Sequence, residues 1–499
     1  MIRHETHFGD RVVRCFAERP GSFYEIFEQA VERNGDGEAL VCGEQRLTWK
    51  ALEDRVTRVA AGLLKQGMRQ GERVALLLGN RIEFVLTFFA AARLGAIAVP
   101  LNIRSQKPEL AYVLEHCAAS LVVHETELAD RLPESPPRVA VHDFHRLLEN
   151  PGDEVVSVEE EDTATILYTS GTTGRPKGAM LSHLGIVHSA MHYERAMGLS
   201  AADRSIAAVP LSHVTGLIAL IATMARCAGT LVLLPAFKAA DFLALAARER
   251  MTHTVLVPAM YNLCLLEPDF GRHDLSRWRI GGYGGAPMPL PTIARFAEKL
   301  PRLGLMNLYG ATETTSPATM MPPHETARHG DSVGLAVPCG EIRVADDGEL
   351  WIKGPMVVRG YWNDAAATAR EFTDGFWHSG DIGAVDAQGF VYVLDRKKDV
   401  INRGGYKVYS AEVESALLEH PGVVEAAVVA VPCPVLGERV HAFVSLRQVI
   451  TEQDLRVFCA ERLADYKVPE SFTFRSEPLP RNANGKVLKR ALREELSGV

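Results

Sequence analysis

The sequence predicts an α/β protein. We expect a large N-terminal domain of helix-covered, mostly parallel sheets, then a β-rich subdomain, and a small α+β domain at the C-terminal end. The 499 residues correspond to several folding units at roughly 100–200 residues per domain. Short apolar runs alternate with helical periodicity through the first two-thirds of the chain, which is typical of parallel strands joined by helices. From about Gly340 onward, short strand patterns and turns replace that alternation.

The elements of the large domain follow from local patterns. Short apolar runs predict strands over 74–78, 96–101, 121–124, 164–168, 206–210, 231–235 and 254–258. Helical periodicity predicts helices over 82–94, 184–198, 239–250 and 289–300. The uncharged run 205–225 is long enough for a bilayer, which takes about 20 residues. Because it contains Pro210, Ser212 and His213, we expect a buried strand, a loop and a buried helix instead, and no integral membrane segment.

The C-terminal part has its own pattern. Residues 349–353 and 390–394 are expected to form short antiparallel strands, and the charged segment 395–399 follows them. The predicted elements after it are a helix over 411–419, strands over 423–431 and 440–446, a helix over 454–463 and a strand over 471–474. This pattern places the domain boundary near residues 395–400.

Composition excludes several classes of protein. Hydrophobic residues make up 47% and charged residues 23%, as in a globular protein with a sizeable core. The formal net charge of −8 argues against a nucleic-acid partner, which needs a basic surface. The eight cysteines form no CxxC pair, so we expect reduced thiols in a cytoplasmic protein rather than a zinc site or disulfides. The N-terminus has no apolar signal core.

Residues 168–178 read Tyr-Thr-Ser-Gly-Thr-Thr-Gly-Arg-Pro-Lys-Gly, after a strand pattern and before a helical one. Glycines let the backbone approach a ligand, while hydroxyl groups and Lys177 offer donors and a positive charge. Together these are what a polyphosphate cradle needs. The segment does not fit the Walker A pattern. An ordinary surface loop is the alternative, but such loops rarely combine all these residue types.

This segment resembles the phosphate-loop signature of the adenylate-forming superfamily, which includes acyl-CoA synthetases, luciferases and the adenylation domains of peptide synthetases. The resemblance covers nearly the whole chain, since further signatures follow in the family's order, and it is most like a fatty-acid-type acyl-CoA ligase. It implies that the loop binds ATP through Thr169, Ser170, Gly171, Thr172, Thr173, Gly174 and Lys177.

Residues 309–313, Tyr-Gly-Ala-Thr-Glu, resemble the family's YGxTE block. The resemblance implies that Tyr309 stacks on adenine beside Gly310 and Ala311, that Thr312 contacts the α-phosphate, and that Glu313 holds Mg²⁺. A carboxylate is a suitable hard ligand for Mg²⁺ shared with phosphates. Upstream, Gly285, Ala286 and Pro287 resemble the segment that borders the nucleotide and acyl pocket.

Three further signatures are similar to those of the family. Asp381, in Trp-His-Ser-Gly-Asp, matches the aspartate that binds both ribose hydroxyls, as an ionised carboxylate can. Arg396 matches an arginine that contacts the ribose and phosphate side. Lys486, in Pro-Arg-Asn-Ala-Asn-Gly-Lys, matches the lysine that bridges the acid and the α-phosphate.

The resemblance also implies two domains, 1–396 with the ATP and acyl pocket and 397–499 as a mobile C-terminal domain. The smaller domain would rotate between the two half-reactions about a hinge near Lys398. Rotation would remove Lys486 and bring Gly404 and Gly405 to the site, where the absence of side chains would let a pantetheine arm pass. His213, in Pro-Leu-Ser-His, resembles a family residue that closes the acyl pocket or the thiol path.

The implied activity is that of an ATP-dependent acid–thiol ligase. A carboxylic acid becomes acyl-AMP with release of pyrophosphate, and its acyl group then passes to coenzyme A. The implied cofactors and partners are ATP, Mg²⁺, coenzyme A and a small-molecule carboxylic acid. The candidate catalytic residues are Lys486, His213, Thr312, Glu313 and Lys177.

We expect the acid to be a fatty acid, because no residue near the predicted pocket is clearly charged. An aryl acid or a small or dicarboxylic acid remains an alternative, and so does a catalytically silent nucleotide-binding scaffold. Tyr283 could shorten the pocket and Arg279 could meet a second carboxylate. Whether the acceptor is free coenzyme A or a carrier protein, and whether the protein forms a homodimer, are left open.

Overall fold

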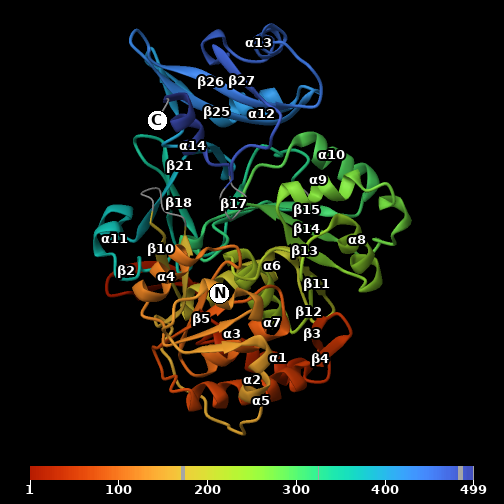
Figure 1. The fold of residues 1–499 in the computed structure, drawn as a ribbon, viewed down its shortest axis with the longest axis vertical. Coiled ribbons are helices and arrows are strands. Elements are labelled where there is room, and N and C mark those ends of the chain that lie inside the picture. The colour runs from red at the N-terminus through yellow and green to blue at the C-terminus, as the bar shows by residue number, and fades with distance from the viewer. Residues whose placement is uncertain (170–174, 324, 482–486, 498–499) are drawn as a thin grey trace. The chain divides into compact units, whose positions relative to one another are not determined.

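A computed structural model describes residues 1–169, 175–323, 325–481 and 487–497, and these residues divide into two compact units (Figure 1). The first unit contains residues 1–343, 351–378 and 387–391. The second contains residues 344–350, 379–386 and 392–499. In the part of the chain that the structure describes, no helix combines the length and apolar character needed to cross a membrane.

One sheet of the first unit has the strand order β10-β9-β6-β5-β7-β8. The pairings are parallel from β9 through β8, and only β10 runs antiparallel to its neighbour within this described sheet. The strands are β5 (Arg73–Leu77), β6 (Ile97–Pro100), β7 (Leu121–His124), β8 (Arg138–Ala140), β9 (Thr163–Thr169) and β10 (Lys177–Ser182). The prediction of a mostly parallel sheet is confirmed here.

Helices with apolar faces cover this sheet. α3 (Ile82–Arg93) is buried along nearly its whole length. Its Phe88 and Phe89 pack on Phe23 of α1 (Phe23–Asn34), with ring centroids 4.9 and 5.2 Å apart. Aromatic packing of this kind stabilises a core beyond the area that it buries. The other helical segments of this region are α1 (Phe23–Asn34), α2 (Trp49–Lys65), α4 (Lys107–His116), η1 (Thr126–Arg131), η2 (Val141–Asp143) and α5 (His145–Leu148).

A second run of strands in the first unit has the order β4-β3-β12-β11-β13-β14-β15-β16-β17. It is parallel from β3 to β15 and antiparallel at both ends. The strands are β3 (Glu38–Cys42), β4 (Gln45–Thr48), β11 (Arg204–Ala207), β12 (Thr230–Leu233), β13 (His253–Leu256), β14 (Ile280–Gly284), β15 (Gly304–Tyr309), β16 (Thr319–Met320) and β17 (Gly334–Ala336).

Figure 1 shows helices grouped beside β13, β14 and β15. They are α8 (Ala239–Arg248), α9 (Pro258–Leu266), η4 (Phe270–Arg272) and α10 (Leu290–Lys299). Their apolar faces form a core cluster with Trp278, around which Tyr261, Phe242 and Phe296 pack. The predicted helices over 239–250 and 289–300 are therefore confirmed within a few residues.

The segment 205–225 is a strand, a loop and a buried helix, as expected, but much of the helix has π geometry. β11 is followed by the π-helix η3 (Thr215–Ala222) and then by α7 (Thr223–Cys227). A π-helix is rare and often marks a functional site.

The order of elements around the phosphate segment also differs from the expectation. The strand β10 lies between that segment and α6 (His183–Met197), where a helix was expected to follow directly.

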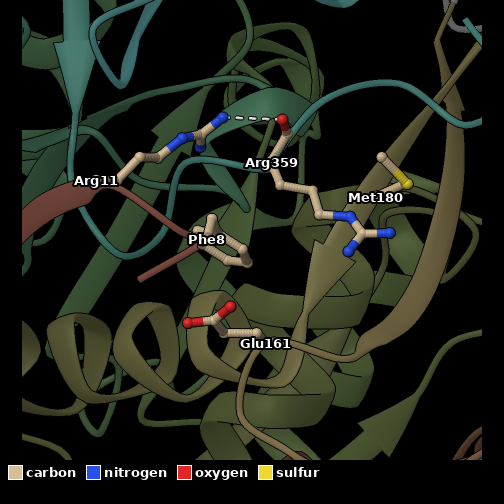
Figure 2. Close-up of a pocket in the computed structure, with 5 residues that line it drawn as sticks. All are labelled: Phe8, Arg11, Glu161, Met180 and Arg359. Carbon is tan, nitrogen blue, oxygen red and sulfur yellow. Dashed lines mark hydrogen bonds between the residues drawn. The ribbon is translucent and has the colours of Figure 1, made fainter. Parts of the chain in front are cut away.

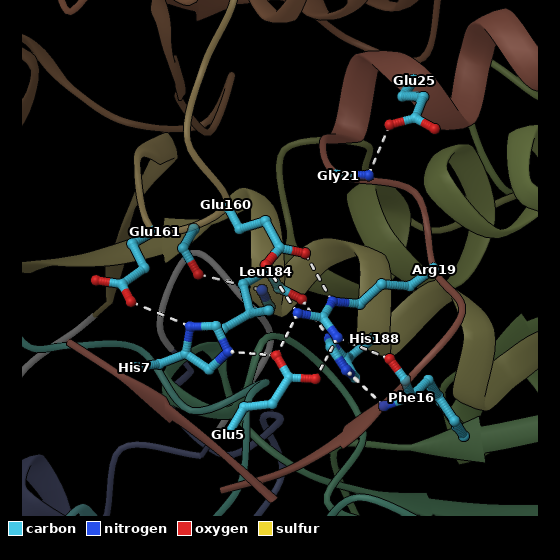
Figure 3. A network of polar contacts seen from close by, with 12 residues as sticks. Glu5, His7, Phe16, Arg19, Gly21, Glu25, Glu160, Glu161, Leu184 and His188 are labelled. Atoms are coloured by element: carbon cyan, nitrogen blue, oxygen red, sulfur yellow. Dashed lines mark hydrogen bonds and ion pairs between the residues drawn. The ribbon is translucent and has the colours of Figure 1, made fainter. Parts of the chain in front are cut away.

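The N-terminal strands β1 (Ile2–His7) and β2 (Arg11–Phe16) form a hairpin held by ion pairs (Figure 3). Arg19 donates to both oxygens of Glu5 at 2.9 and 2.7 Å and to both oxygens of Glu160 at 2.6 and 2.8 Å. The ring of His7 lies 3.0 Å from Glu161. These contacts attach the hairpin to the chain that leads into β9.

The β-rich part of the chain contributes residues to both units. Its elements are η5 (Thr312–Thr314), β18 (Glu341–Val344), β19 (Glu349–Lys353), α11 (Ala365–Glu371), β20 (Phe372–Thr373), β21 (Phe376–Val385) and β22 (Phe390–Arg396). Within the first unit, β17 pairs antiparallel with β22 at Phe390 and Val391. The predicted strands over 349–353 and 390–394 are confirmed.

The second unit contains a sheet of order β24-β23-β26-β25, with β27 parallel to β26. Two helices, α12 (Ser410–Leu418) and α13 (Glu452–Ala460), supply Val413 and Leu455 to its core, against Val428 and Val440. Its elements are β23 (Ile401–Arg403), β24 (Tyr406–Val408), α12 (Ser410–Leu418), β25 (Val423–Cys433), β26 (Gly437–Leu446), α13 (Glu452–Ala460), η6 (Asp465–Lys467), β27 (Ser471–Arg475) and α14 (Lys489–Ser497). The predicted α+β order is confirmed.

Candidate active site

The two described ends of the phosphate segment belong to paired antiparallel strands. Thr169, the last residue of β9, is paired in register with Lys177, the first residue of β10. The predicted residues Ser170, Gly171, Thr172, Thr173 and Gly174 lie outside the described residues. Because β9 and β10 are hydrogen-bonded to each other, Thr169 and Lys177 lie opposite each other at the two ends of the loop.

Lys177 is held by a carboxylate from a distant part of the chain. Its Nζ lies 2.7 and 2.6 Å from the two oxygens of Glu371, at the end of α11, and 4.3 Å from the centre of the Tyr361 ring. The lysine side chain is only 11% exposed. A cation this close to an aromatic face and a carboxylate has a defined position.

Glu313 is buried in η5, and its carboxylate accepts a hydrogen bond from the Tyr361 hydroxyl at 3.0 Å. Burial raises the pKa of Glu313. The same hydroxyl lies 2.7 Å from Glu371. Burial opposes the charge of Glu371 too, but hydrogen bonds from Lys177 and Tyr361 outweigh it and lower the pKa of that carboxyl. Two side chains thus connect Lys177 to Glu313.

Tyr361 and Glu371 are the site residues that the sequence analysis missed. Tyr361 follows Gly360 in an apolar stretch, and Glu371 is an acidic residue at the end of a short helix. Glu371 is 194 positions from Lys177. No local spacing or motif identifies such a pair, because only the fold brings the residues together.

The loop that carries Tyr309, Gly310, Ala311 and Thr312 turns sharply back on itself. A Cβ atom added to Gly310 would lie 1.7 Å from the carbonyl oxygen of Ser316, so only glycine fits there. The Ala311 N–H donates to Thr314 Oγ1 at 2.9 Å.

The end of this loop is strained but firmly held. Thr315 and Ser316 have φ values of 47° and 93°, in the left-handed region that non-glycine residues rarely adopt. The Thr315 hydroxyl donates to Met356 O at 2.6 Å, and Ser316 Oγ lies 2.8 Å from Tyr193 Oη. Strain of this kind persists where the surroundings determine the conformation, as in binding sites.

Gly285, Ala286 and Pro287 form an exposed turn directly after β14, and Gly285 has a φ of +79°. Gly284 is in register with Leu308 of the neighbouring parallel strand β15. The turn 285–287 and the loop 309–312 therefore leave the carboxyl ends of adjacent strands. Ligands of open α/β sheets bind at such ends.

His213 lies just before η3 and is half-buried. Its carbonyl accepts from Leu217 N at 3.0 Å, while its own N–H donates to Pro210 O at 3.2 Å. A Cβ on Gly216 would lie 2.4 Å from Pro210 O, so this glycine permits the tight approach. The histidine backbone is well fixed.

The two residues whose role in the acyl pocket was open are both engaged elsewhere. Tyr283 is 1% exposed and belongs to the core cluster around Trp278. Arg279 pairs with Asp203 at 2.9 Å and donates to the carbonyls of Met197 and Gly198. Neither residue therefore supports the idea of a charged acyl pocket.

In the second unit the structure brings Asp381 and Arg396 together. Asp381 is buried, and its Oδ1 lies 2.9 Å from Arg396 Nε. Arg396 also donates to Ser379 O at 3.3 Å. The arginine side chain is 49% exposed, so the pair combines a fixed carboxylate with an accessible cation.

The other predicted residues of this unit are Lys398, Gly404, Gly405 and Lys486. Lys398 is exposed between β22 and β23. Gly404 and Gly405 form the turn between β23 and β24 with φ values of +58° and +91°. Lys486 lies outside the described residues.

A cavity of about 370 Å³ lies beside β10, on the first unit (Figure 2). Its lining residues are Phe8, Arg11, Glu161, Met180 and Arg359. None of them belongs to the predicted site. Arg11 donates to the backbone carbonyls of Val358 and Arg359 at 2.9 and 2.8 Å. The arginine therefore ties the N-terminal hairpin to the segment that leads to Tyr361.

Glu5, His7 and Cys15 offer metal-ligand atoms within 4.8 Å of one another. Their chemistry does not favour a metal. Arg19 already occupies both oxygens of Glu5, and burial raises the pKa of the Cys15 thiol to about 12. A cation there would meet a guanidinium and a protonated thiol.

The family model of the AMP-binding enzyme matches residues 27–362, and that of the AMP-binding enzyme C-terminal domain matches residues 412–486. The chain is 35% identical to the 2-succinylbenzoate–CoA ligase of Bacillus licheniformis, over 93% of this chain and 98% of that protein. It is 36% identical to a feruloyl-CoA synthase of Amycolatopsis, over 90% and 94%.

A third relative is a long-chain-fatty-acid–CoA ligase of Mycobacterium tuberculosis, 34% identical over 91% of this chain and 93% of that protein. Among solved structures, the o-succinylbenzoate CoA synthetase of Bacillus subtilis in complex with its acyl-adenylate intermediate has a TM-score of 0.86 at 31% identity, covering 95% and 98%. The anthranilate CoA ligase AuaEII in complex with anthranoyl-AMP has a TM-score of 0.89 at 26% identity, covering 96% and 98%.

Proposed function

This chain belongs to the AMP-binding enzyme family as an acyl-CoA synthetase, and on that premise we propose that it joins an acid with an apolar body to coenzyme A through acyl-AMP. The observation that carries the proposal is the placement of Lys177 beside the loop ends and its connection to the buried Glu313. A cation and a buried carboxylate around a phosphate loop suit a nucleotide with its Mg²⁺.

In the first step, a carboxylate oxygen of the acid attacks the α-phosphorus of ATP. The bond from that phosphorus to the bridging oxygen breaks, and pyrophosphate leaves. The protein positions the reactants and neutralises charge, and no covalent enzyme intermediate is needed. Lys177 supplies positive charge at the phosphate loop. Mg²⁺ usually takes one or two protein carboxylates plus phosphate oxygens, so Glu313 fits as its ligand, and the bound ion would neutralise charge on the phosphates.

In the second step, the sulfur of coenzyme A attacks the acyl carbonyl carbon. The bond to the AMP oxygen breaks, AMP leaves, and the thiol proton passes to solvent. The chain holds the nucleotide meanwhile: Tyr309 stacks on adenine, Thr312 contacts the α-phosphate, and Asp381 with Arg396 binds the ribose side.

The remaining roles follow the same proposal. His213 closes the acyl pocket or the thiol path. Residues 1–396 and 397–499 act as two domains with a hinge near Lys398. Lys486 serves adenylation, while Gly404 and Gly405 border the thiol path in the second step. The eight cysteines carry free thiols, which supports a cytoplasmic location.

The acid itself is a fatty acid or an aryl acid. Three relatives of similar identity are named as a long-chain-fatty-acid–CoA ligase, a 2-succinylbenzoate–CoA ligase and a feruloyl-CoA synthase. A small dicarboxylic acid such as malonic acid has less support, because Arg279 is already paired with Asp203. We keep the fatty acid as the first candidate, because Tyr283 is uncharged and Arg279 is paired with Asp203.

A panel assay tests the function. The protein is incubated with ATP, Mg²⁺, coenzyme A and fatty acids of increasing length, ferulic, benzoic, 2-succinylbenzoic and malonic acids. Pyrophosphate release and loss of free thiol are both measured. Both signals with one class of acid are expected. Pyrophosphate release without thiol loss would mean that the acceptor is not coenzyme A. If no acid gave either signal and the protein also bound no ATP, both the ligase and the nucleotide-binding scaffold would be contradicted.

Replacing Asp381 with asparagine is expected to raise the KM for ATP by about tenfold to a hundredfold. A hydrogen bond to a charged group contributes about 1.5–3 kcal/mol, and the amide offers the ribose one acceptor instead of a carboxylate. The measurement is pyrophosphate release as a function of ATP concentration. Asp346→Asn is the control, because Asp346 is exposed in the same unit. Equal KM values for both variants would contradict the ribose role.

A further inference from the structure

We propose that Tyr361 and Glu371 are positioning residues that couple the phosphate-loop lysine to the metal ligand. We name them the Tyr361–Glu371 bridge. The proposal rests on the proposed function, in which Lys177 serves the phosphates and Glu313 serves Mg²⁺. It adds that the two sites do not act independently. Because one chain of contacts holds both groups, binding of Mg²⁺ strengthens binding of ATP through the protein as well as through the phosphates.

Glu371 determines where the ammonium group of Lys177 lies. Both of its oxygens contact Nζ, at 2.7 and 2.6 Å, and the Tyr361 ring lies beneath at 4.3 Å. A lysine side chain otherwise has four rotatable bonds and a point charge with no preferred direction. Two hydrogen bonds and a cation–π contact remove most of that freedom before a nucleotide binds.

Tyr361 connects that carboxylate to the next. Its hydroxyl lies 2.7 Å from Glu371 Oε2 and 3.0 Å from Glu313 Oε1, so two acidic groups share one hydroxyl. Without the hydroxyl, the two carboxyl groups would face each other with no donor between them. Glu371 would keep its hydrogen bonds from Lys177, whereas the buried Glu313 would lose the donor that Tyr361 supplies, so we expect Glu313 to move.

The backbone around the bridge gives it little freedom to adjust. Val358 N donates to Glu313 O at 2.9 Å, and Trp362 N donates to Gly178 O at 2.7 Å. Tyr361 itself forms a β-bridge with Ala179, two residues after Lys177. The segment 358–362 is therefore attached on one side to the loop of Glu313 and on the other to the strand of Lys177.

Two more contacts fix the ends of the bridge. Tyr361 N donates to Thr368 Oγ1 at 2.9 Å, which ties the tyrosine to α11, the helix that ends at Glu371. Arg11, in the N-terminal hairpin, donates to the carbonyl of Arg359 (Figure 2) and also to that of Val358. A displacement at Glu313 is consequently transmitted to Lys177 rather than absorbed between them.

The test is calorimetric titration of ATP into the full-length protein at a series of Mg²⁺ concentrations, which needs no acid substrate. In the parent, Mg²⁺ is expected to increase ATP affinity strongly. In Tyr361→Phe, which keeps the ring and loses the hydroxyl, the Mg²⁺ concentration for half of that increase is expected to rise about three- to tenfold. Such a shift corresponds to the net value of a typical hydrogen bond.

Glu371→Gln is expected to weaken ATP affinity at every Mg²⁺ concentration, because the lysine loses its ionic partner. The double variant Tyr361→Phe/Glu371→Gln is expected to differ from Tyr361→Phe by much less than the single Glu371→Gln differs from the parent. Non-additivity of this kind is the signature of residues in one network. A merely structural role would lower the melting temperature without moving the Mg²⁺ midpoint.

Matched controls are available in the first unit. Tyr261→Phe removes a fully buried hydroxyl that donates to Gly282 O at 2.9 Å. Glu194→Gln breaks an ion pair with Arg226 in which the glutamate side chain is 19% exposed, against 22% for Glu371. Both controls should keep the parent's Mg²⁺ midpoint.

The outcomes separate this proposal from the proposed function. A parent that binds no ATP would overturn the function, and the bridge with it. A parent that binds ATP in a Mg²⁺-dependent manner, with bridge variants that behave like the two controls or with additive effects in the double variant, would overturn the bridge alone. A shifted midpoint in Tyr361→Phe with unchanged midpoints in the controls would support it.

Discussion

Replacing Gly310 with alanine is expected to lower the rate of pyrophosphate release by roughly a hundredfold at saturating ATP. The added Cβ would lie 1.7 Å from Ser316 O, so the backbone of the loop must move. That loop carries Thr312 and Glu313, and a shift of about 1 Å in a reacting geometry can lower a rate by that factor. The rate is measured as pyrophosphate release with the best acid of the panel.

Gly271→Ala is the matched control, since a Cβ there meets no atom within 4 Å and the residue does not have a positive φ. Its activity should equal that of the parent. Thermal unfolding of both variants distinguishes a displaced loop from an unfolded protein. A Gly310→Ala variant with parental activity would show that the loop relaxes without moving Thr312 and Glu313, contrary to our interpretation of the site.

Acid is expected to destabilise the protein well before its carboxylates are protonated, through two histidines of α6. Burial lowers the pKa of His183 and of His188 to about 4 each. His183 Nδ1 accepts from Phe23 N at 3.1 Å, and His188 Nε2 accepts from Phe16 N at 3.2 Å. Both rings are neutral in the folded protein, whereas the unfolded chain binds protons below about pH 6.5.

Between pH 6.5 and 4 the unfolded state therefore holds more protons than the folded state, so the free energy of unfolding falls as the pH falls. Each histidine is expected to remove about 2 kcal/mol between pH 7.5 and pH 5, from about 1.4 kcal/mol per pH unit. Urea unfolding at the two pH values measures the sum over the buried histidines, to which His192 of α6 and His253 of β13 also contribute, because burial lowers their pKa values too.

Single-residue variants test whether His183 causes this pH dependence of the free energy of unfolding. His183→Asn keeps an acceptor near Phe23 N and cannot titrate, so the difference in unfolding free energy between pH 7.5 and pH 5 should shrink by about 2 kcal/mol. His4→Asn, at an exposed position, should leave that difference unchanged. If His183→Asn kept the full pH dependence of the parent, the neutral buried imidazole would not be its source.

Much of the architecture was predictable because it depends on the pattern of neighbouring residues in the sequence. Apolar runs and helical periodicity located β5, β7, β13, α3 and α12 within a few residues, since side-chain periodicity reflects which face of an element is buried. The signature segments also identified the family correctly. Their glycines, hydroxyls and charges lie within a few positions of one another, so that the chemistry is readable along the chain.

Other features were not predictable from local patterns. β10 was missed because the phosphate segment lies between it and β9, and the apolar residues after Lys177 merge with the helical pattern of α6. The π geometry of η3 was not predicted, because the apolar run Thr215–Ala222 has the composition of any buried helix. Arg279 was a candidate for the acyl pocket, but it pairs with Asp203, which lies 76 positions away along the chain.

The candidate site likewise contains residues that the sequence predicted and residues that only the tertiary structure identified. Lys177, Glu313 and Asp381 could be named in advance, because each belongs to a contiguous motif whose residue types suit phosphate, magnesium or ribose. Their partners could not. Glu371 meets Lys177 across 194 positions, and Tyr361 meets Glu313 across 48. Residue chemistry is a local property of the chain, whereas the contacts that give a charge its position and its pKa arise only when distant segments pack together.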